Sequence, residues 1–239
     1  MTALLLSVLL LSPSPAVADE IGRLGRTYAG LRSYTQTTET VAHGQVSGQS
    51  STTTFRSTLR LRRPDRIYFE VSSPTMGVLL ASNDGASLRI FAGKTRQIWT
   101  MRPVRTIDAF FAALSRHRMA FECDPISFLC GRVPALSSVA ARPITVEGIS
   151  GTMLTGTLES RATWPGVRGR ASLLVDTDTG LLRRVELAFT GIPVRGGAAV
   201  ASNTITVRVR SLRANPVLAD GSFTFATPRG AIAAKYPGR

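Results

Sequence analysis

Residues 59–74 read LRLRRPDRIYFEVSSP, and apolar side chains occupy every second position along each half of this stretch. An alternation with a period of two is typical of β-strands that bury one face and leave the other in contact with water. Pro64-Asp65 has turn chemistry, so we predict two strands joined by a short turn. We expect the arginines to face water or a membrane surface. The side chains that we expect to face the interior are Leu59, Leu61, Ile67, Phe69 and Val71.

Similar short segments cover most of the chain. Alternating or apolar runs separated by Gly, Pro, Asn and Asp occur over residues 34–103 and 143–228, including a Gly/Ser turn region around Gly44 to Ser51. Strands this short and this closely spaced predict an antiparallel meander rather than βαβ units. The sequence therefore predicts a mainly β protein with a few helices and about ten or eleven strands.

Two amphipathic segments interrupt the strands. Residues 19–31 have apolar side chains at helical spacing, and residues 106–119 carry the apolar stripe Ile107, Phe110, Phe111 and Leu114. Residues 106–142 as a whole are predicted to be a mostly non-strand insertion, with 133–141 irregular or briefly helical. We expect one domain over residues 19–239.

The first residues have the character of a targeting segment. Residues 3–11 are an apolar run, and Ala16 and Ala18 form a small-x-small cleavage pattern. We predict a signal peptide over residues 1–18, cleaved before Asp19. No cysteine follows the run, so we expect an exported protein without a membrane anchor.

The chain is strongly basic, with 29 Lys and Arg against 15 Asp and Glu and a net charge of +14. A basic exported protein is attracted to anionic membranes or acidic partners. Because the arginines are scattered and form no nucleic-acid-binding motif, we expect no nucleic acid partner.

Two cysteines, Cys123 and Cys130, lie in the stretch CDPISFLCG. Export favours a disulfide between them, and that is our expectation. The alternative is a short helix with Asp124 as N-cap and Gly131 after its end. A straight helix would separate the two Cα atoms by about 10 Å, which is too far for a disulfide. Two cysteines alone do not make a metal site.

Catalytic motifs are missing from the sequence. There is no zinc-protease, esterase or phosphate-binding loop pattern, and His43 and His117 have the surroundings of surface residues. We expect no enzyme activity, no catalytic residues, no metal and no cofactor. What remains is the apolar face of the sheet, which fits a filled core and a ligand-binding hollow equally well.

Four stretches, taken together and in this order, resemble one superfamily. They are residues 59–74, residues 79–103 (LLASNDGASLRIFAGKTRQIWTMRP), residues 173–187 (LLVDTDTGLLRRVEL) and residues 215–231 (NPVLADGSFTFATPRGA). They resemble the LolA-like periplasmic lipoprotein carriers. The resemblance implies a single open, strongly curved antiparallel β half-barrel whose helices cover its concave mouth.

The resemblance also implies a function. A soluble periplasmic carrier of this kind shelters lipoprotein acyl chains between an inner-membrane transporter and an outer-membrane receptor, and we expect a monomer. Arg63, just before the proline, corresponds to an arginine that controls the lid. The alternative is an envelope-stress sensor or regulator that binds a partner protein or lipid. The expected lipid-binding residues are Leu59, Leu61, Ile67, Phe69, Val71, Val78, Leu80, Ile90, Phe110, Phe111 and Leu114.

Overall fold

The structure is a computed structural model that describes residues 15–115, 123–160, 164–193 and 200–236. His117 and most of the predicted signal peptide lie outside these ranges. Helix α1 (Pro15–Ala29) is already helical before the predicted cleavage point, so cleavage would leave a helix that begins at Asp19. Among the described residues no helix has the length and apolar character needed to cross a membrane.

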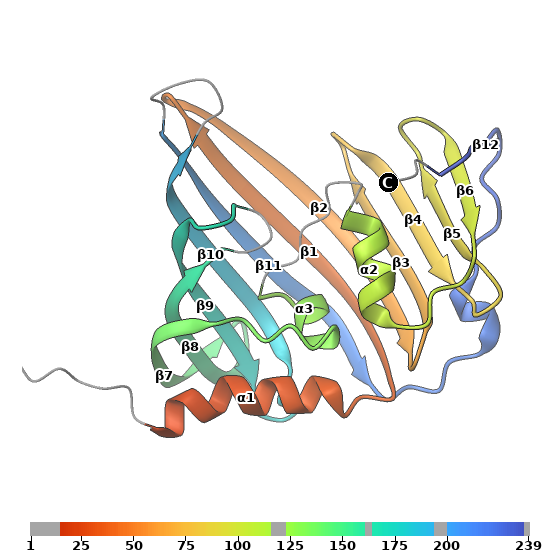
Figure 1. Ribbon diagram of the computed structural model, residues 1–239. Helices are drawn as coiled ribbons and strands as arrows, with labels where there is room; N and C mark the ends of the chain where they lie inside the picture. The colour runs from red at the N-terminus through yellow and green to blue at the C-terminus, as the bar shows by residue number, and fades with distance from the viewer. Residues whose placement is uncertain (1–14, 116–122, 161–163, 194–199, 237–239) are drawn as a thin grey trace, which may run out of the picture.

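One sheet of 12 strands forms the body of the protein (Figure 1). Its order is β12-β6-β5-β4-β3-β2-β1-β11-β10-β9-β8-β7, antiparallel throughout except for the β12–β6 pair. The strands are β1 (Ser33–Val46), β2 (Gln49–Arg62), β3 (Arg66–Ser73), β4 (Gly77–Asn83), β5 (Leu88–Ala92), β6 (Gln97–Met101), β7 (Leu136–Val146), β8 (Ile149–Glu159), β9 (Arg168–Asp176), β10 (Leu182–Pro193), β11 (Val200–Ala214) and β12 (Ile232–Ala233).

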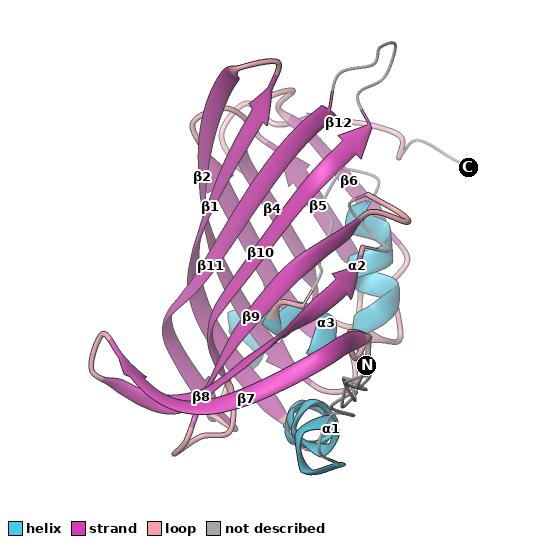
Figure 2. Ribbon diagram, turned by 90° about the vertical axis from the view of Figure 1, so that its left-hand side faces the viewer, coloured by secondary structure: helices cyan, strands magenta, loops and turns pink. Residues whose placement is uncertain are grey.

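The sheet curves strongly but stays open, because β7 and β12 are its two edges and do not pair with each other. Helices α1, α2 (Ile107–Ser115) and α3 (Pro125–Leu129) all lie on its concave side (Figures 1 and 2). This arrangement confirms the predicted open half-barrel with helices over its concave face.

The stretch that predicts the fold forms the inner face of β2 and β3. Leu59 pairs with Phe69, and Leu61 pairs with Ile67. Helix α2 covers this face, with the Phe111 ring 5.6 Å from the Phe69 ring in an edge contact. The covered side chains belong to one continuous core, which also contains Val71, Ile90, Phe110 and Leu114.

Two expectations about local structure were wrong. Residues 136–141 are not irregular but form the start of β7, so the non-strand insertion ends before Leu136. Serine and alanine favour strands weakly, and pairing with β8 decides the conformation. The turn predicted over Gly44 to Ser51 is only Ser47-Gly48, where both residues have positive φ, as a two-residue hairpin turn requires.

Residues 215–231, here called the C-terminal strap, cover the outer face of β3 to β6 and of the Arg60–Arg62 end of β2 (Figure 1). The chain then joins the sheet edge as β12, and Tyr236 reaches α2 on the concave side. The strap contains the 3₁₀ helix η1 (Asp220–Phe223), and Phe223 is fully buried. Arginines from the outer face hold its backbone: Arg60 donates to Ser222 O, Arg62 to Leu218 O, Arg89 to Phe225 O and Arg96 to Gly230 O. Arg60 and Arg62 therefore do not simply face water, as expected, but clamp the strap.

Val78 and Leu80 also lie on this outer face, which corrects their expected place inside the trough. Leu80 pairs with Glu70, and Val78 pairs with Ser72, both outward positions of β3. Leu79 and Ala81 point inward instead and are buried. Because the strap covers the outer side, this strand is apolar on both faces, and alternation could not show its orientation.

We predict that Arg89→Ala loosens the strap. The substitution removes hydrogen bonds to Phe225 O (2.9 Å) and Thr227 Oγ1 (2.7 Å), together with the contact of the guanidinium with the Phe225 ring. The free energy of unfolding should fall by about 1–3 kcal/mol, and amide exchange should accelerate in the strap. Arg102→Ala, which changes an exposed residue, is the control. Equal amide exchange of the strap in the two variants would show that Arg89 does not hold the strap.

Candidate functional site

The concave face is buried at one end and open at the other. Along the inward positions of β1, Tyr34 and Gln36 are buried, Thr40 and Ala42 are half-buried, and Val46 near the turn is 40% exposed. The described helices lie over the end where β1 begins, while the β1–β2 hairpin extends beyond them (Figure 1). The part of the trough near the hairpin turn is therefore the accessible part.

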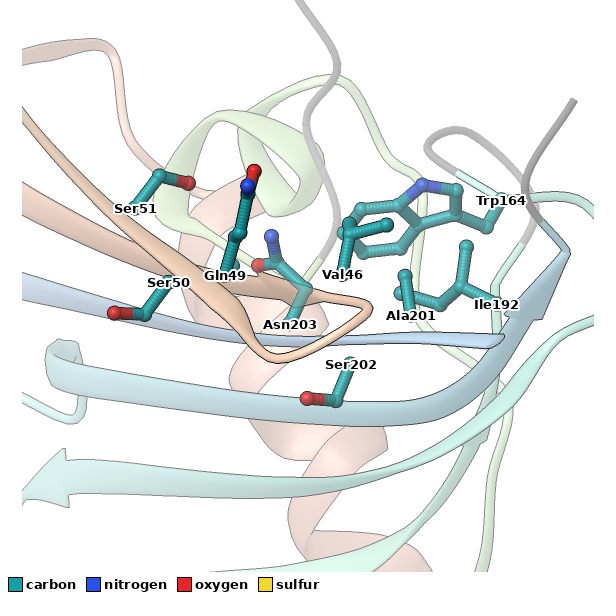
Figure 3. Close-up of a pocket in the computed structure, with 10 residues that line it drawn as sticks. Val46, Gln49, Ser50, Ser51, Trp164, Ile192, Ala201, Ser202 and Asn203 are labelled. Carbon is teal, nitrogen blue, oxygen red and sulfur yellow. The ribbon is translucent and has the colours of Figure 1, made fainter. Parts of the chain in front are cut away.

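A hollow of about 420 Å³ lies at this open end (Figure 3). We call it the hairpin hollow. Its volume falls within the range of small-molecule binding sites. The lining residues come from the β1–β2 hairpin, from β10 and β11, and from the loop before β9. They are Gly44, Val46, Gln49, Ser50, Ser51, Trp164, Ile192, Ala201, Ser202 and Asn203.

Apolar side chains gather at one side of the hairpin hollow. Trp164 lies with Val46, Ile192 and Ala201 (Figure 3), and its ring meets Phe189 edge-on at 5.1 Å. The Trp164 backbone N–H donates to Ser160 Oγ at 2.8 Å, which fixes the loop. This group supplies an aromatic wall and branched aliphatic contacts.

Amide side chains occupy another side of the hollow, where Gln49 and Asn203 lie near each other (Figure 3). The Oδ1 atom of Asn203 is buried and accepts no hydrogen bond from the residues that the structure describes. An unmet buried acceptor costs about 1–3 kcal/mol, so a ligand that donates a hydrogen bond there would be favoured. The hollow can thus hold an apolar group next to a polar one.

The expected lipid-binding residues lie in a different part of the trough. Leu59, Leu61, Ile67, Phe69, Val71, Ile90, Phe110, Phe111 and Leu114 are all buried in the core between the sheet and α2. None of them lines the hairpin hollow. Sequence reasoning missed Trp164, Ile192 and Ala201. Residues 143–228 were recognised as strand-rich, but Trp164 stands in a loop, where no periodicity marks it.

Arg63 ties two helices to the end of β2. Its guanidinium donates to Leu31 O at 2.9 Å, to Tyr28 O at 3.3 Å and to Leu129 O at 3.2 Å. These carbonyls lie at or just beyond the C-terminal ends of α1 and α3, where helices leave acceptors unsatisfied. Burial lowers the pKa of Arg63, although its side chain keeps its charge. One cation therefore holds both helices over the concave face.

The structure shows a helix, not a disulfide, at the two cysteines. Asp124 caps α3 by accepting from Ser127 N at 2.9 Å, and Cys130 follows the last helical residue. No bond joins Cys123 to Cys130. The helical cap and Gly131 in a left-handed conformation settle the conflict between the two predicted geometries. Burial raises the pKa of the Cys130 thiol to about 12, so it stays protonated.

Catalytic and metal-binding groups do not assemble in the described part of the chain. His43 is exposed on β1, not in a turn, and its Nδ1 lies 2.8 Å from Thr52 Oγ1. No three His, Cys, Asp or Glu side chains within the described ranges are placed to hold a metal ion.

Comparison with known proteins gives structural neighbours only. No protein-family model and no curated protein matches this sequence. A LolA superfamily protein of Nitrosomonas europaea is similar in structure at 9% identity and a TM-score of 0.33, covering 87% of this chain and 97% of that one. Solved LolA superfamily structures are thus among those similar to this chain, as the sequence resemblance predicts.

Two other solved structures are similar. A conserved protein of Thermus thermophilus has 8% identity and a TM-score of 0.43, covering 92% of this chain and 99% of that one. The MucA/MucB complex of Pseudomonas aeruginosa has 16% identity and a TM-score of 0.43, covering 88% of this chain and 61% of that one. At such TM-scores the likeness carries no argument about what this chain binds.

We predict that Arg63→Ala frees the ends of α1 and α3. Three carbonyls lose a charged donor, so the free energy of unfolding should fall by about 2–3 kcal/mol. Arg63→Lys should recover only part of this loss, because an ammonium lacks the planar fork that contacts several acceptors. Amide exchange in 24–31 and 126–130 should rise in both variants. A uniform rise in amide exchange over the whole sheet would contradict a local role of Arg63 at the ends of α1 and α3.

We predict a pH dependence that comes from Asp124. Burial raises the pKa of this carboxyl to about 6, so the folded protein holds the proton more tightly than the unfolded chain. Its stabilising contribution is full below about pH 4 and is lost as the pH rises through 6. Asp124→Asn keeps a good cap without the titration. The stability of the native protein relative to this variant should fall by about 2 kcal/mol between pH 4 and 7. If the difference in the free energy of unfolding between the native protein and Asp124→Asn stayed constant from pH 4 to 7, the raised pKa of Asp124 would be contradicted.

Proposed function

We propose that this protein binds the acyl chain of a lipid on the concave face of its sheet, with the hairpin hollow as the entry. The observation that carries the proposal is the aromatic and aliphatic wall of Trp164, Val46 and Ile192 beside an accessible trough. Each methylene group buried against such a wall contributes about 0.8 kcal/mol.

The path of the chain follows the inward positions of the long strands. From the hairpin hollow these lead to Phe55 and Ile205, which are half-buried and pack against the core. Beyond them Phe110 and Phe111 of α2 fill the trough. A short chain would end at α2. A longer one would reach Leu59 and Phe69 only if α2 moves aside.

The attachment of α2 rests mainly on apolar packing, which supports its assignment as the element that moves. Asp108 forms an exposed ion pair with Arg132, and Tyr236 Oη donates to Ala113 O at 2.9 Å. Exposed ion pairs contribute little to stability, so apolar packing on Phe69 is the main attachment. An acyl chain can replace that packing with contacts of the same kind, so α2 is the movable part of the cover.

The proposed biological role is that of a periplasmic carrier. The predicted signal peptide supports a location outside the cytoplasm, and the resemblance to lipoprotein carriers supports the acyl chains of a lipoprotein as the cargo. An inner-membrane transporter and an outer-membrane receptor would then be its partners.

The test uses the two tryptophans of the chain. In a Trp99→Phe background the emission comes from Trp164 alone, and a fluorescent fatty acid should quench it by energy transfer. Trp164→Ala should weaken fatty acid binding, measured by the probe's own emission, about 10-fold or more, because a large aromatic contact is lost. Val217→Ala, at an exposed position in the strap, is the control and should bind normally. Failure of the native protein to bind the probe would overturn the proposal.

A further inference from the structure

The outer face of the sheet is covered on one half only. In the described structure the strap lies over β3 to β6 and the Arg60–Arg62 end of β2, whereas the outer sides of β1, β11, β10, β9 and the Arg56 end of β2 carry no helix or strap (Figure 2). Seven arginines of these strands have outward register positions: Arg56, Arg168, Arg170, Arg184, Arg208, Arg210 and Arg213.

Strand register places four charges in one row across this face. Arg56 of β2 lies opposite Glu39 of β1, which lies opposite Arg208 of β11. Arg208 in turn lies opposite Arg184 of β10. Two cations are thus direct cross-strand neighbours, an arrangement that destabilises a sheet unless an anion lies between them.

The protein's own anions compensate only part of this charge. Glu147 lies 3.6 Å from Arg184 Nη1 and 3.9 Å from Arg208 Nε, and Glu39 accepts from Arg210 at 2.8 Å. Glu186 pairs with Arg184. Arg168 lies 3.9 Å from Glu159. Seven arginines therefore share four glutamates, and none of Arg56, Arg170 and Arg213 forms an ion pair within the described ranges.

Unmet donors lie in the centre of this row. The Nε atoms of Arg184 and Arg208 are buried from water and donate no hydrogen bond within the described part of the chain. By contrast, the arginines of the covered half donate to strap carbonyls, as described above. The charges of Arg56, Arg170 and Arg213 thus have no ion-pair partner within the described part of the chain.

The neighbours of these arginines indicate the kind of partner. They are small polar side chains such as Thr37, Thr206 and Ser172, and no aromatic residue of these five strands faces outward in the described structure. Protein interfaces need buried aromatic or aliphatic anchors, and single-stranded nucleic acids need stacking surfaces. A membrane rich in anionic headgroups needs only charge, and each arginine near such a surface contributes about a fivefold gain in affinity.

We propose that this uncovered outer face is a docking surface for an anionic phospholipid membrane, with phosphate oxygens as acceptors for the exposed guanidinium groups of Arg56, Arg170 and Arg213. In this orientation the helices and the hairpin hollow lie on the opposite side of the sheet, away from the headgroups. Docking is electrostatic and reversible, and it does not depend on acyl chain binding inside the trough.

The test is sedimentation of the full chain with vesicles of phosphatidylcholine, with and without phosphatidylglycerol. Binding should require phosphatidylglycerol and should fall steeply as salt is added. The double variant Arg56→Gln/Arg213→Gln removes two exposed charges that form no ion pair, so folding should be preserved. Its affinity for the anionic vesicles should fall about 20-fold.

The matched control is Arg102→Gln/Arg105→Gln, which removes the same charge from exposed positions between β6 and α2. It should lose less than about threefold in affinity. Equal losses in the two double variants would show that net charge alone acts and would overturn the assignment. Equal binding to neutral vesicles, or binding to polyglutamate without binding to vesicles, would also overturn it.

Discussion

One guanidinium holds the cover of this sheet in place. Arg63 follows the last residue of β2 and donates to carbonyls from two helices that are far apart in sequence. Helices as short as α3 are unstable alone. Their position over the sheet therefore depends on packing and on such terminal contacts. Tyr28 adds to this anchor, since its ring stacks on Phe128 of α3 and its hydroxyl accepts from Leu182 N at 3.2 Å.

The anchor has a consequence for where a ligand can bind. Because α1 and α3 are held at the end where β2 terminates, the cover is tight there, and the trough opens only toward the β1–β2 turn. The long hairpin extends past the helices, and its inner positions become steadily more exposed. The concave face therefore has a filled core at one end and a binding hollow at the other. The alternation of apolar residues is the same in both parts, so the sequence pattern could not distinguish them.

Strand patterning predicted the fold well where the outward side chains are polar or charged, as Arg60, Arg62 and Glu70 are. β2 and β3 follow the alternation of residues 59–71. The prediction failed at β4, where the strap buries the outer side and removes the polar half of the pattern. It failed at Cys123 and Cys130 because the capping preferences of Asp124 and Gly131 outweigh the expected disulfide. The strap overlaps the run of residues 143–228 that was predicted to be strand-rich, but it forms a 3₁₀ helix and loops, and only contacts between residues distant in sequence show that it lies across the outer face.

The most direct measurement is photo-crosslinking of the full chain with a diazirine-labelled fatty acid, followed by peptide mapping. The account predicts labelled peptides from residues 42–55 and 201–205 and from the loop that holds Trp164, with weaker labelling of α2. Labelling confined to the outer face or the strap, or no labelling above a denatured control, would contradict the claim that the open end of the trough receives an acyl chain.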